Sequence, residues 1–195
     1  MNDNPDRLRW DARYRDTAAP GDACRVLREN LHLLPARGRA LDLACGTGGN
    51  ALLLAEGGLD TEAWDISPVG LAVLQRAAAT RSLAITTREM DLAHATLPRA
   101  AFDVIVVSRF LERALCPAIS AALRPGGLLF YQTFTRERVS DAGPSNPAWR
   151  LARGELLRLF ADLEPVIYRE EGLLGDTSQC FRDEAMLVAR RPSPA

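Results

Sequence analysis

The residues best suited to chemistry gather in one glycine-rich stretch, residues 40–51. An apolar run reaching Leu43 leads into the turn residues Gly46 and Gly48, and a second apolar segment follows them. This order is typical of a strand, a tight turn and a helix. Glycines allow a ligand to approach the backbone closely, and the start of a helix presents unpaired N–H groups to it. The stretch therefore indicates a site for a nucleotide-like ligand.

Two acidic residues narrow the choice of ligand. The spacing of Gly46, Gly48 and Ala51 matches the dinucleotide fingerprint G-x-G-x-x-G/A. Asp42 lies four residues before Gly46, where a carboxylate suits a cationic amino group and repels a pyrophosphate. Asp65 ends the next apolar run and can accept hydrogen bonds from both hydroxyls of a ribose. Asp65 suits both a dinucleotide cofactor and S-adenosylmethionine, whereas Asp42 favours S-adenosylmethionine.

The Asp-x-Ala-x-Gly-x-Gly run that begins at Asp42 resembles motif I of class I S-adenosylmethionine-dependent methyltransferases, usually Asp/Glu-x-Gly-x-Gly-x-Gly. Ala44 replaces the first glycine, so a Cβ must be tolerated near the ligand. Residues 123–129 resemble the L-[KR]-P-G-G-x-[LF] signature before the fifth strand of these enzymes. Residues 132–156 also look similar to bacterial methyltransferases grouped with the tellurite-resistance and thiopurine enzymes, which implies a small, soft acceptor.

The resemblance implies a set of cofactor contacts along the carboxyl edge of the sheet. Asp91 follows the third predicted strand, where it can accept a hydrogen bond from the adenine amino group. A solvated turn aspartate is the alternative for this residue. Ser108 and Arg109 directly follow the most strand-like run. The expected cofactor-binding residues are Asp42, Ala44, Cys45, Gly46, Gly48, Asn50, Asp65, Ile66, Asp91, Leu92 and Ser108.

Methyl transfer from a sulfonium is an in-line displacement, to which a protein contributes positioning and a dry site. A sulfur, selenium or tellurium nucleophile is reactive near neutral pH, so no strong base is required. The catalytic residues stay open, with Tyr14 and Arg109 as candidates. An aromatic face such as that of Tyr14 or Trp10 can hold the cation. Arg109, Arg113 and Arg136 are candidates for binding an anionic acceptor, although surface arginine is the default alternative.

The elements that position these residues alternate between strands and helices. Such alternation predicts an α/β fold with a Rossmann-like doubly wound, mostly parallel sheet. The short connection before the final strand predicts an antiparallel C-terminal β-hairpin. Strands are expected over residues 40–43, 61–65, 83–87, 102–107, 128–134, 163–169 and 184–190, and helices over 22–34, 51–55, 67–80, 116–123 and 154–160.

A chain of 195 residues is expected to form a single domain. We assign residues 1–37 to an N-terminal helical lid or cap, 38–135 to the cofactor-binding core, and 136–195 to a substrate-side loop and the C-terminal strands. Trp10 and Tyr14 would share one helix face, and docking on the core is an equal alternative to a lid. Residues 135–150 lack periodicity, which indicates a functional loop or a surface connection.

Composition excludes several other classes. A net charge of −1 provides no field that recruits nucleic acid or a membrane surface, so the partner is expected to be a small molecule. All 24 basic residues are arginine, which excludes Schiff-base and P-loop lysine chemistry. The four cysteines and two histidines lack metal-ligand spacing. The N-terminus lacks an apolar leader, so we expect a cytoplasmic protein, either a monomer or a homodimer.

Two other functions remain open from the sequence. One is a catalytically idle methyltransferase-like fold that serves as a binding or regulatory protein. The other is an NAD(P)-dependent oxidoreductase, which is less well supported because short-chain forms use a Tyr-x-x-x-Lys pair and this chain has no lysine. Cofactor titration separates the oxidoreductase from the others, and product formation separates an enzyme from an idle binder.

Overall fold

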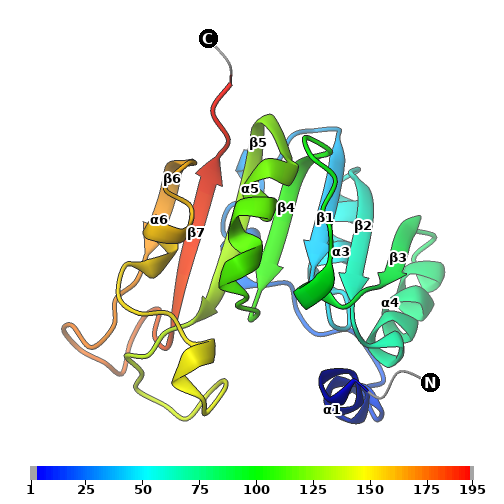
Figure 1. Ribbon diagram of the computed structural model, residues 1–195. Coiled ribbons are helices and arrows are strands. Elements are labelled where there is room, and N and C mark those ends of the chain that lie inside the picture. The colour runs from blue at the N-terminus through cyan, green and yellow to red at the C-terminus, as the bar shows by residue number, and fades with distance from the viewer. Residues whose placement is uncertain (1–3, 194–195) are drawn as a thin grey trace.

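The computed structural model describes residues 4–193, so residues 1–3 of the expected lid and 194–195 of the tail lie outside the described residues. A seven-stranded sheet in the order β3-β2-β1-β4-β5-β7-β6 forms the centre of the structure (Figure 1). Its strands are β1 (Arg39–Leu43), β2 (Asp60–Asp65), β3 (Ile85–Glu89), β4 (Phe102–Ser108), β5 (Leu123–Phe134), β6 (Glu164–Arg169) and β7 (Glu184–Arg190).

The strand directions confirm the predicted fold class. Strands β1 to β5 pair in parallel, whereas β7 runs antiparallel to both β5 and β6. The carboxyl ends of β1, β2 and β4 therefore meet at one edge of the sheet, the lower edge in Figure 1. The antiparallel hairpin at the end of the chain, which the sequence predicts, inserts β7 between β5 and β6.

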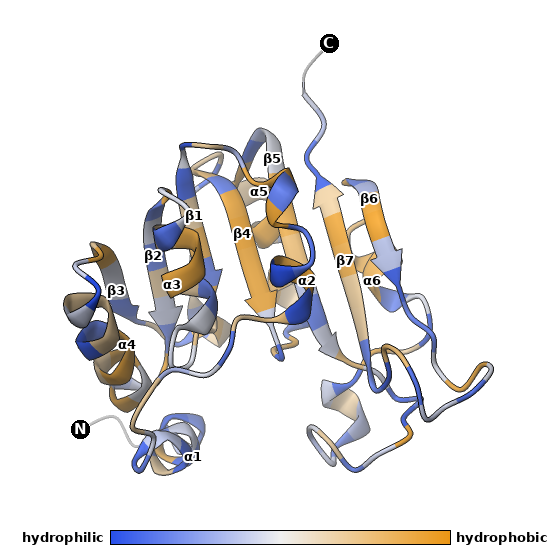
Figure 2. Ribbon diagram, turned by 180° about the vertical axis from the view of Figure 1, so that it is seen from behind, coloured by the Kyte–Doolittle hydropathy of each residue, from blue (hydrophilic) through white to orange (hydrophobic). Residues whose placement is uncertain are grey.

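Helices cover both faces of the sheet. Helices α2 (Arg25–Arg28), α3 (Gly49–Glu56) and α4 (Pro68–Thr80) lie on one face, and α5 (Cys116–Ala122) and α6 (Glu155–Leu159) lie on the other (Figures 1 and 2). Helix α1 (Pro5–Tyr14) lies beyond the carboxyl edge. Short 3-10 turns occupy Leu31–Leu33, Leu92–His94, Arg113–Leu115 and Pro147–Trp149. Within residues 4–193, no helix has the length and apolar character that crossing a membrane requires.

Strand β4 is apolar apart from Asp103 and Ser108, as expected of a strand buried on both faces, and Figure 2 shows most of it in the colours of hydrophobic residues. Val106 packs on the face that carries Leu27 of α2 and Leu54 of α3. Val107 packs on the opposite face with Ile119 of α5. The two faces thus hold separate apolar clusters, and the sheet between them fixes the edge at which the polar residues gather.

Several element boundaries differ from the prediction, most clearly those of β3 and β5. The third strand runs over Ile85–Glu89 rather than 83–87, because the Leu83 N–H donates to the Ala78 carbonyl and closes helix α4. Strand β5 begins at Leu123 rather than residue 128, because Leu123 already pairs with Phe102 across an irregular register. The last residue of the helix predicted over 116–123 is therefore part of a strand.

The helix expected over residues 22–34 is interrupted, and Asp22 does not cap it. Helix α2 begins only at Arg25, with Cys24 at the N-cap position. The preceding backbone is held by the glycine-rich turn instead, since the Gly21 N–H donates to Thr47 and the Cys24 N–H donates to Asn50. Long-range hydrogen bonds outweigh the local helix signal here.

Arg150 organises the irregular loop that follows β5. Its side chain is buried and donates to the carbonyl oxygens of Thr135, Ala142 and Pro144. The guanidinium also lies over the ring of Phe134, 5.5 Å from the ring centroid. One side chain therefore satisfies several carbonyls of a segment that forms little regular structure.

Replacing Arg150 with methionine should lower the free energy of unfolding by about 2 kcal/mol, because buried carbonyls would lose their donors. For a chain of this size, the thermal midpoint should fall by about 4–8 °C. The exposed Arg138 provides the matched control, and Arg138→Met should change the midpoint by less than about 2 °C. Equal midpoints for the two variants in a thermal melt would contradict the role of Arg150.

Candidate functional site

The glycine-rich turn takes a backbone conformation that explains its sequence. Gly46 and Gly48 both have positive φ angles, 55° and 84°. A Cβ on Gly48 would lie 2.4 Å from Cδ1 of Leu74, so a larger residue would also collide with α4. Ala44 has a φ of 57°, a left-handed conformation that costs a non-glycine residue about 1–2 kcal/mol. Glycine is therefore the unstrained residue at this position.

Asp42, Asn50 and Ser108, all predicted to contact the cofactor, form one hydrogen-bonded group. Asp42 is fully buried and accepts hydrogen bonds from the Ala51 N–H at 3.0 Å and from Nδ2 of Asn50 at 3.2 Å. The same Asn50 nitrogen lies 3.1 Å from Oγ of Ser108. Burial raises the pKa of Asp42 to about 7, although these hydrogen bonds oppose the rise. The Asn50 amide thus joins β1, α3 and β4.

Asp65 ties the end of β2 to the glycine-rich turn. Its two carboxylate oxygens accept from the Gly46 N–H at 2.7 Å and from the Ser67 N–H at 2.8 Å, and Ile66 separates Asp65 from Ser67 in the chain. Burial raises the pKa of Asp65, and these backbone hydrogen bonds oppose the rise. The residue is buried at the turn where the sequence predicts a ribose contact, and that contact stays a prediction.

Asp91 and Leu92 begin the short turn after β3. Asp91 accepts the Ala93 N–H on one oxygen and Nδ2 of Asn4, at 2.8 Å, on the other. Leu92 is buried in the core beneath it. The predicted adenine contact therefore faces the start of helix α1.

Helix α1 lies across the predicted cofactor contacts. Beyond Asn4, its Asp11 accepts a hydrogen bond from Oγ of Ser67 at 2.5 Å. The hydroxyl of Tyr14 packs so close to Gly46 that a Cβ there would lie 2.8 Å from it. Burial raises the pKa of Tyr14 well above its usual value, so the phenol keeps its proton at neutral pH. Tyr14 contacts the turn as a neutral hydroxyl.

Arg9 links helix α1 to the loop over residues 135–150. Its guanidinium carbon lies 5.4 Å from the centroid of Trp10 and 5.1 Å from that of Trp149. Trp10 also stacks on Tyr14 with 5.6 Å between ring centroids, which confirms that the two share one face of the helix. The two segments predicted to flank the site are thus joined through one exposed arginine.

The three arginines proposed for an anionic acceptor have different surroundings. Arg113 pairs with Glu155 and donates to the carbonyls of Ala148 and Arg150, and Arg136 donates to the Pro147 carbonyl. Both hold the loop over residues 135–150. Arg109 has a φ of 54°, and its side chain is 67 % exposed with Nε 3.2 Å from Glu184. Only Arg109 of these three lines one of the two described cavities.

Sequence reasoning missed several residues at this edge. Gln132 of β5 accepts the Val26 N–H at 2.7 Å and donates to Glu184, which in turn holds Arg109. The polar Gln132 inside an otherwise apolar strand is the signal that could have identified it. The contacts of Asn4 and Asp11 carry no comparable signal, because they depend on where α1 docks.

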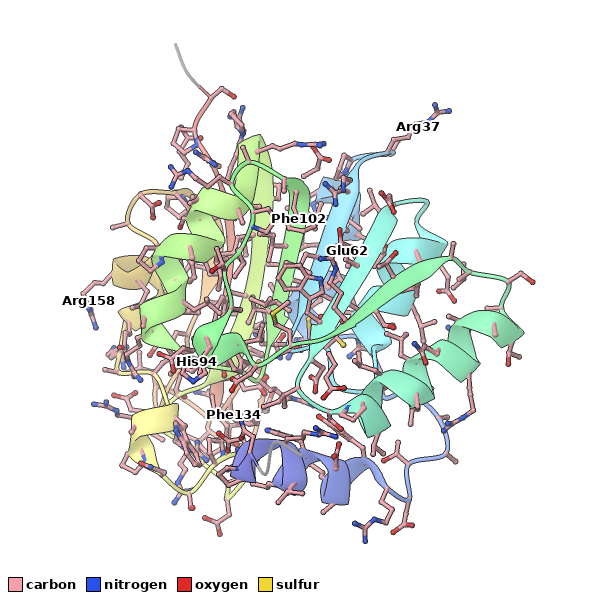
Figure 3. All side chains as sticks on the ribbon, turned by 45° about the vertical axis from the view of Figure 1, so that its right-hand side comes forward. Arg37, Glu62, His94, Phe102, Phe134 and Arg158 are labelled. Atoms are coloured by element: carbon pink, nitrogen blue, oxygen red, sulfur yellow. The ribbon has the colours of Figure 1, made fainter. Side chains whose placement is uncertain are left out.

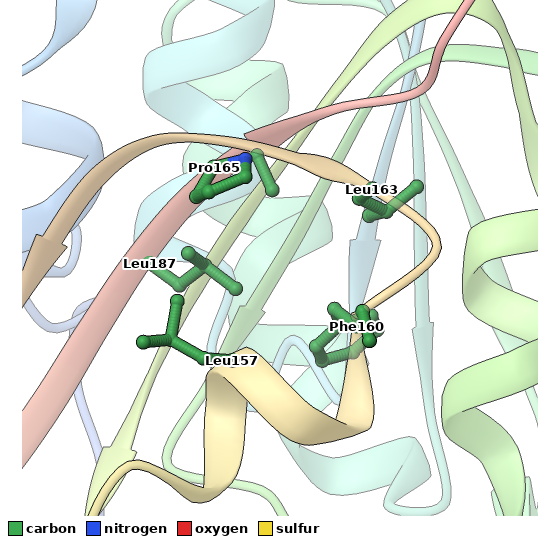
Figure 4. A pocket seen from close by; sticks show the side chains of 7 residues that line it. Leu157, Phe160, Leu163, Pro165 and Leu187 are labelled. Atoms are coloured by element: carbon green, nitrogen blue, oxygen red, sulfur yellow. The ribbon is translucent and has the colours of Figure 1, made fainter.

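A second hollow, of about 350 Å³, lies between α6 and strands β6 and β7 (Figure 4). It is lined by apolar side chains, those of Leu157, Phe160, Ala161, Leu163, Pro165, Leu187 and Ala189. Within the described part of the chain, no ionisable side chain lines this hollow, and it shares no lining residue with the polar cavity that contains Arg109. The hollow is therefore separate from the polar site at the carboxyl edge.

Comparison with known proteins supports the resemblance found from the sequence. Residues 40–127 match the family model of a methyltransferase domain. Hemagglutinin 1 of Eikenella corrodens is 32% identical over 140 residues, which cover 68% of this chain and 46% of that protein. Demethylmenaquinone methyltransferase of Thermus thermophilus is 34% identical over 113 residues, covering 54% of this chain and 51% of that protein. The chain therefore spans about half the length of these curated relatives.

Solved structures confirm the class I methyltransferase fold. TehB from Haemophilus influenzae superposes with a TM-score of 0.69 and 22% identity, covering 95% of this chain and 66% of that one. A structure described as the conversion of a disulfide bond into a thioacetal group during echinomycin biosynthesis gives a TM-score of 0.71 and 24% identity. That match covers 97% of this chain and 93% of the other.

Proposed function

We propose that this protein is an enzyme that transfers a methyl group from S-adenosylmethionine to a small-molecule acceptor. The observation that best supports this proposal is the arrangement of Asp42, Gly46 and Asp65 around a left-handed turn at the carboxyl edge of the sheet. Open α/β sheets bind their ligands at this edge. The match of residues 40–127 to a methyltransferase domain supports the same reaction.

The residues present fit this cofactor from its adenine end to its methionyl end. Asp91 at the end of β3 suits the adenine amino group, and Asp65 at the end of β2 suits the ribose hydroxyls. The carboxylate of Asp42, near the end of β1, favours a cationic amino group. The three carboxylates thus follow the strand order β3-β2-β1, which matches the order of polar groups along the cofactor.

When bound, S-adenosylmethionine supplies an electrophilic methyl group on a sulfonium. The chain's own residues would position the acceptor and exclude water, with α1 and the 135–150 loop covering the edge. Tyr14 keeps its proton at neutral pH and acts as a hydrogen-bond donor rather than as a base. The acceptor we propose is a soft sulfur, selenium or tellurium nucleophile, which needs no strong base. The fold shared with the thioacetal-forming structure is consistent with sulfur as the acceptor.

Binding of S-adenosylhomocysteine should weaken as the pH falls below about 7, the pKa of Asp42 in the free protein. A cationic amino group beside Asp42 favours the ionised carboxylate, so binding at lower pH must release a proton. Affinity should fall by up to about tenfold per pH unit between pH 7 and 5.5. Calorimetry in buffers of different ionisation enthalpy measures the proton released.

Asp42→Asn is the matched control, because it keeps the shape and removes the titration. Its affinity should be lower at pH 8 and should change little down to pH 5.5. The pH dependence of folding stability provides a second measure of the Asp42 pKa. Because folding raises this pKa from 3.8 to about 7, protonated Asp42 contributes to the free energy of unfolding below pH 4, and this contribution is lost as the pH rises through 7. A wild-type affinity that rises on acidification would contradict the amino-group contact.

The function is tested by an acceptor screen with methyl-labelled S-adenosylmethionine, after binding of S-adenosylhomocysteine has been measured. Labelled product with a thiol, selenol or tellurite-derived acceptor is the expected result. Cofactor binding without product across oxygen, nitrogen and sulfur acceptors would instead support the idle binding protein. Product with oxygen or nitrogen acceptors alone would overturn the soft acceptor and keep the methyltransferase.

A further inference from the structure

A polar cavity of about 470 Å³ opens beside the predicted cofactor site. Four segments far apart in the chain form its wall, namely α2 with the residues leading into it, the end of β4, the C-terminal part of β5, and the start of β7 with the residues leading into it. The lining residues are Gly21, Asp22, Ala23, Cys24, Arg25, Arg28, Ser108, Arg109, Gln132, Cys180, Phe181, Arg182 and Glu184. Its size suits a small organic molecule.

Four arginines line this cavity together with two carboxylates, those of Asp22 and Glu184. Two of the arginines are engaged elsewhere. Arg25 pairs with Glu29, and Arg182 donates to carbonyl oxygens of its own loop. Arg109 pairs with one carboxylate oxygen of Glu184, and the other oxygen of Glu184 accepts a hydrogen bond from the side chain of Gln132.

Arg28 is the arginine available to a ligand. It is exposed at the end of α2, and within residues 4–193 no carboxylate oxygen lies within 4 Å of its guanidinium. A guanidinium presents a planar fork of donors that fits a carboxylate or an oxyanion in a bidentate way. The cavity wall thus carries one unpaired cation and a second, Arg109, held by a single ion pair.

The strand order places this cavity on the acceptor side of the cofactor site. Ser108, Gln132 and Glu184 lie on the adjacent strands β4, β5 and β7. Neighbouring strands are about 4.8 Å apart, so β7 lies roughly 19 Å from β2, where the ribose is expected. The cavity therefore lies on the far side of β1 and β4 from the adenosine end.

We propose that this cavity binds an anionic group, a carboxylate or an oxyanion, of the methyl acceptor, with Arg28 and Arg109 as its binding residues. This inference rests on the proposed methyl transfer and names the charge of its acceptor. The incoming anion competes with Glu184 for Arg109, while Gln132 continues to donate to Glu184. The anion itself anchors the acceptor, and the nucleophilic atom lies on the side facing Ser108.

The test measures binding of two thiols to the protein loaded with S-adenosylhomocysteine. Thiosalicylate carries a carboxylate, and thiophenol is the matched thiol without one. The wild-type protein should bind thiosalicylate at least tenfold more tightly by calorimetry, and Arg28→Gln should reduce that preference to less than threefold. Arg37→Gln is the control, because Arg37 points into solvent at the opposite edge of the sheet (Figure 3) and should leave the preference unchanged.

The methionyl carboxylate of the cofactor is the competing source of an anion. S-adenosylhomocysteine carries this carboxylate, and 5′-methylthioadenosine lacks it. If Arg28→Gln weakens the first but not the second, the cavity holds the cofactor and the assignment to the acceptor is overturned. Equal binding of the two thiols to the wild-type complex also overturns it, while leaving methyl transfer intact. Failure of the wild-type protein to bind S-adenosylhomocysteine is the separate result that refutes the proposed function.

Discussion

Replacing Asp65 with alanine should lower the affinity for S-adenosylhomocysteine by about 100-fold, and by at least tenfold. The variant removes two predicted ribose hydrogen bonds to a charged acceptor, each contributing about 1.5–3 kcal/mol before the site relaxes. It also removes the acceptor for the Gly46 N–H, 2.7 Å from the carboxylate, so the glycine-rich turn loses a constraint. Isothermal titration calorimetry gives the two dissociation constants.

Two further variants separate ribose binding from general damage. Asp65→Asn keeps one acceptor oxygen and should fall between the wild type and Asp65→Ala. Asp60→Ala removes an exposed carboxylate from the first residue of the same strand and should bind normally. A folded Asp65→Ala protein with an unchanged dissociation constant would place the ribose elsewhere.

Deleting residues 1–16 should abolish methyl transfer while leaving the protein folded. Among the described residues of helix α1, none is fully buried, so its removal costs the core little. The same helix contacts Asp91, Ser67 and the glycine-rich turn, so its removal opens the predicted cofactor site to water. A thermal melt and a transfer assay on the truncated protein give the two readouts. A midpoint that falls together with activity would assign α1 to core packing instead.

Hydrogen exchange tests whether α1 and the 135–150 loop close together. Both segments should gain protection when S-adenosylhomocysteine binds, since Arg9 joins Trp10 to Trp149. Arg9→Gln removes this link and should reduce the protection gained by the loop more than that gained by the glycine-rich turn. Equal protection of both segments with and without ligand would reject the lid.

Much of the fold could be predicted because it depends on local signals. Apolar runs of four to seven residues predicted the strands, and Ser67 before Pro68 correctly marked the start of α4, where its hydroxyl caps Gly70. The glycine-rich turn was also predictable, since positive φ angles favour glycine. The positions of Asp42 and Asp65 at the carboxyl edge follow from these elements alone.

The parts that could not be predicted depend on contacts between distant residues. Helix α2 starts late because the amides before it bond to Thr47 and Asn50, which lie in the glycine-rich turn and α3. The early start of β5 depends on pairing between Leu123 and Phe102. Arg28 has no spacing that distinguishes it from other surface arginines, and its position in the cavity emerges only when α2 and the β6–β7 connection meet.

Calorimetric titration of the wild-type protein with S-adenosylhomocysteine and with NADH is the most direct test of the central claim. The carboxylate of Asp42, buried beside the glycine-rich turn, favours an amino group and disfavours a pyrophosphate. We predict a micromolar dissociation constant for S-adenosylhomocysteine and no measurable heat with NADH. Micromolar binding of NADH together with no binding of S-adenosylhomocysteine would contradict the assignment as a methyltransferase.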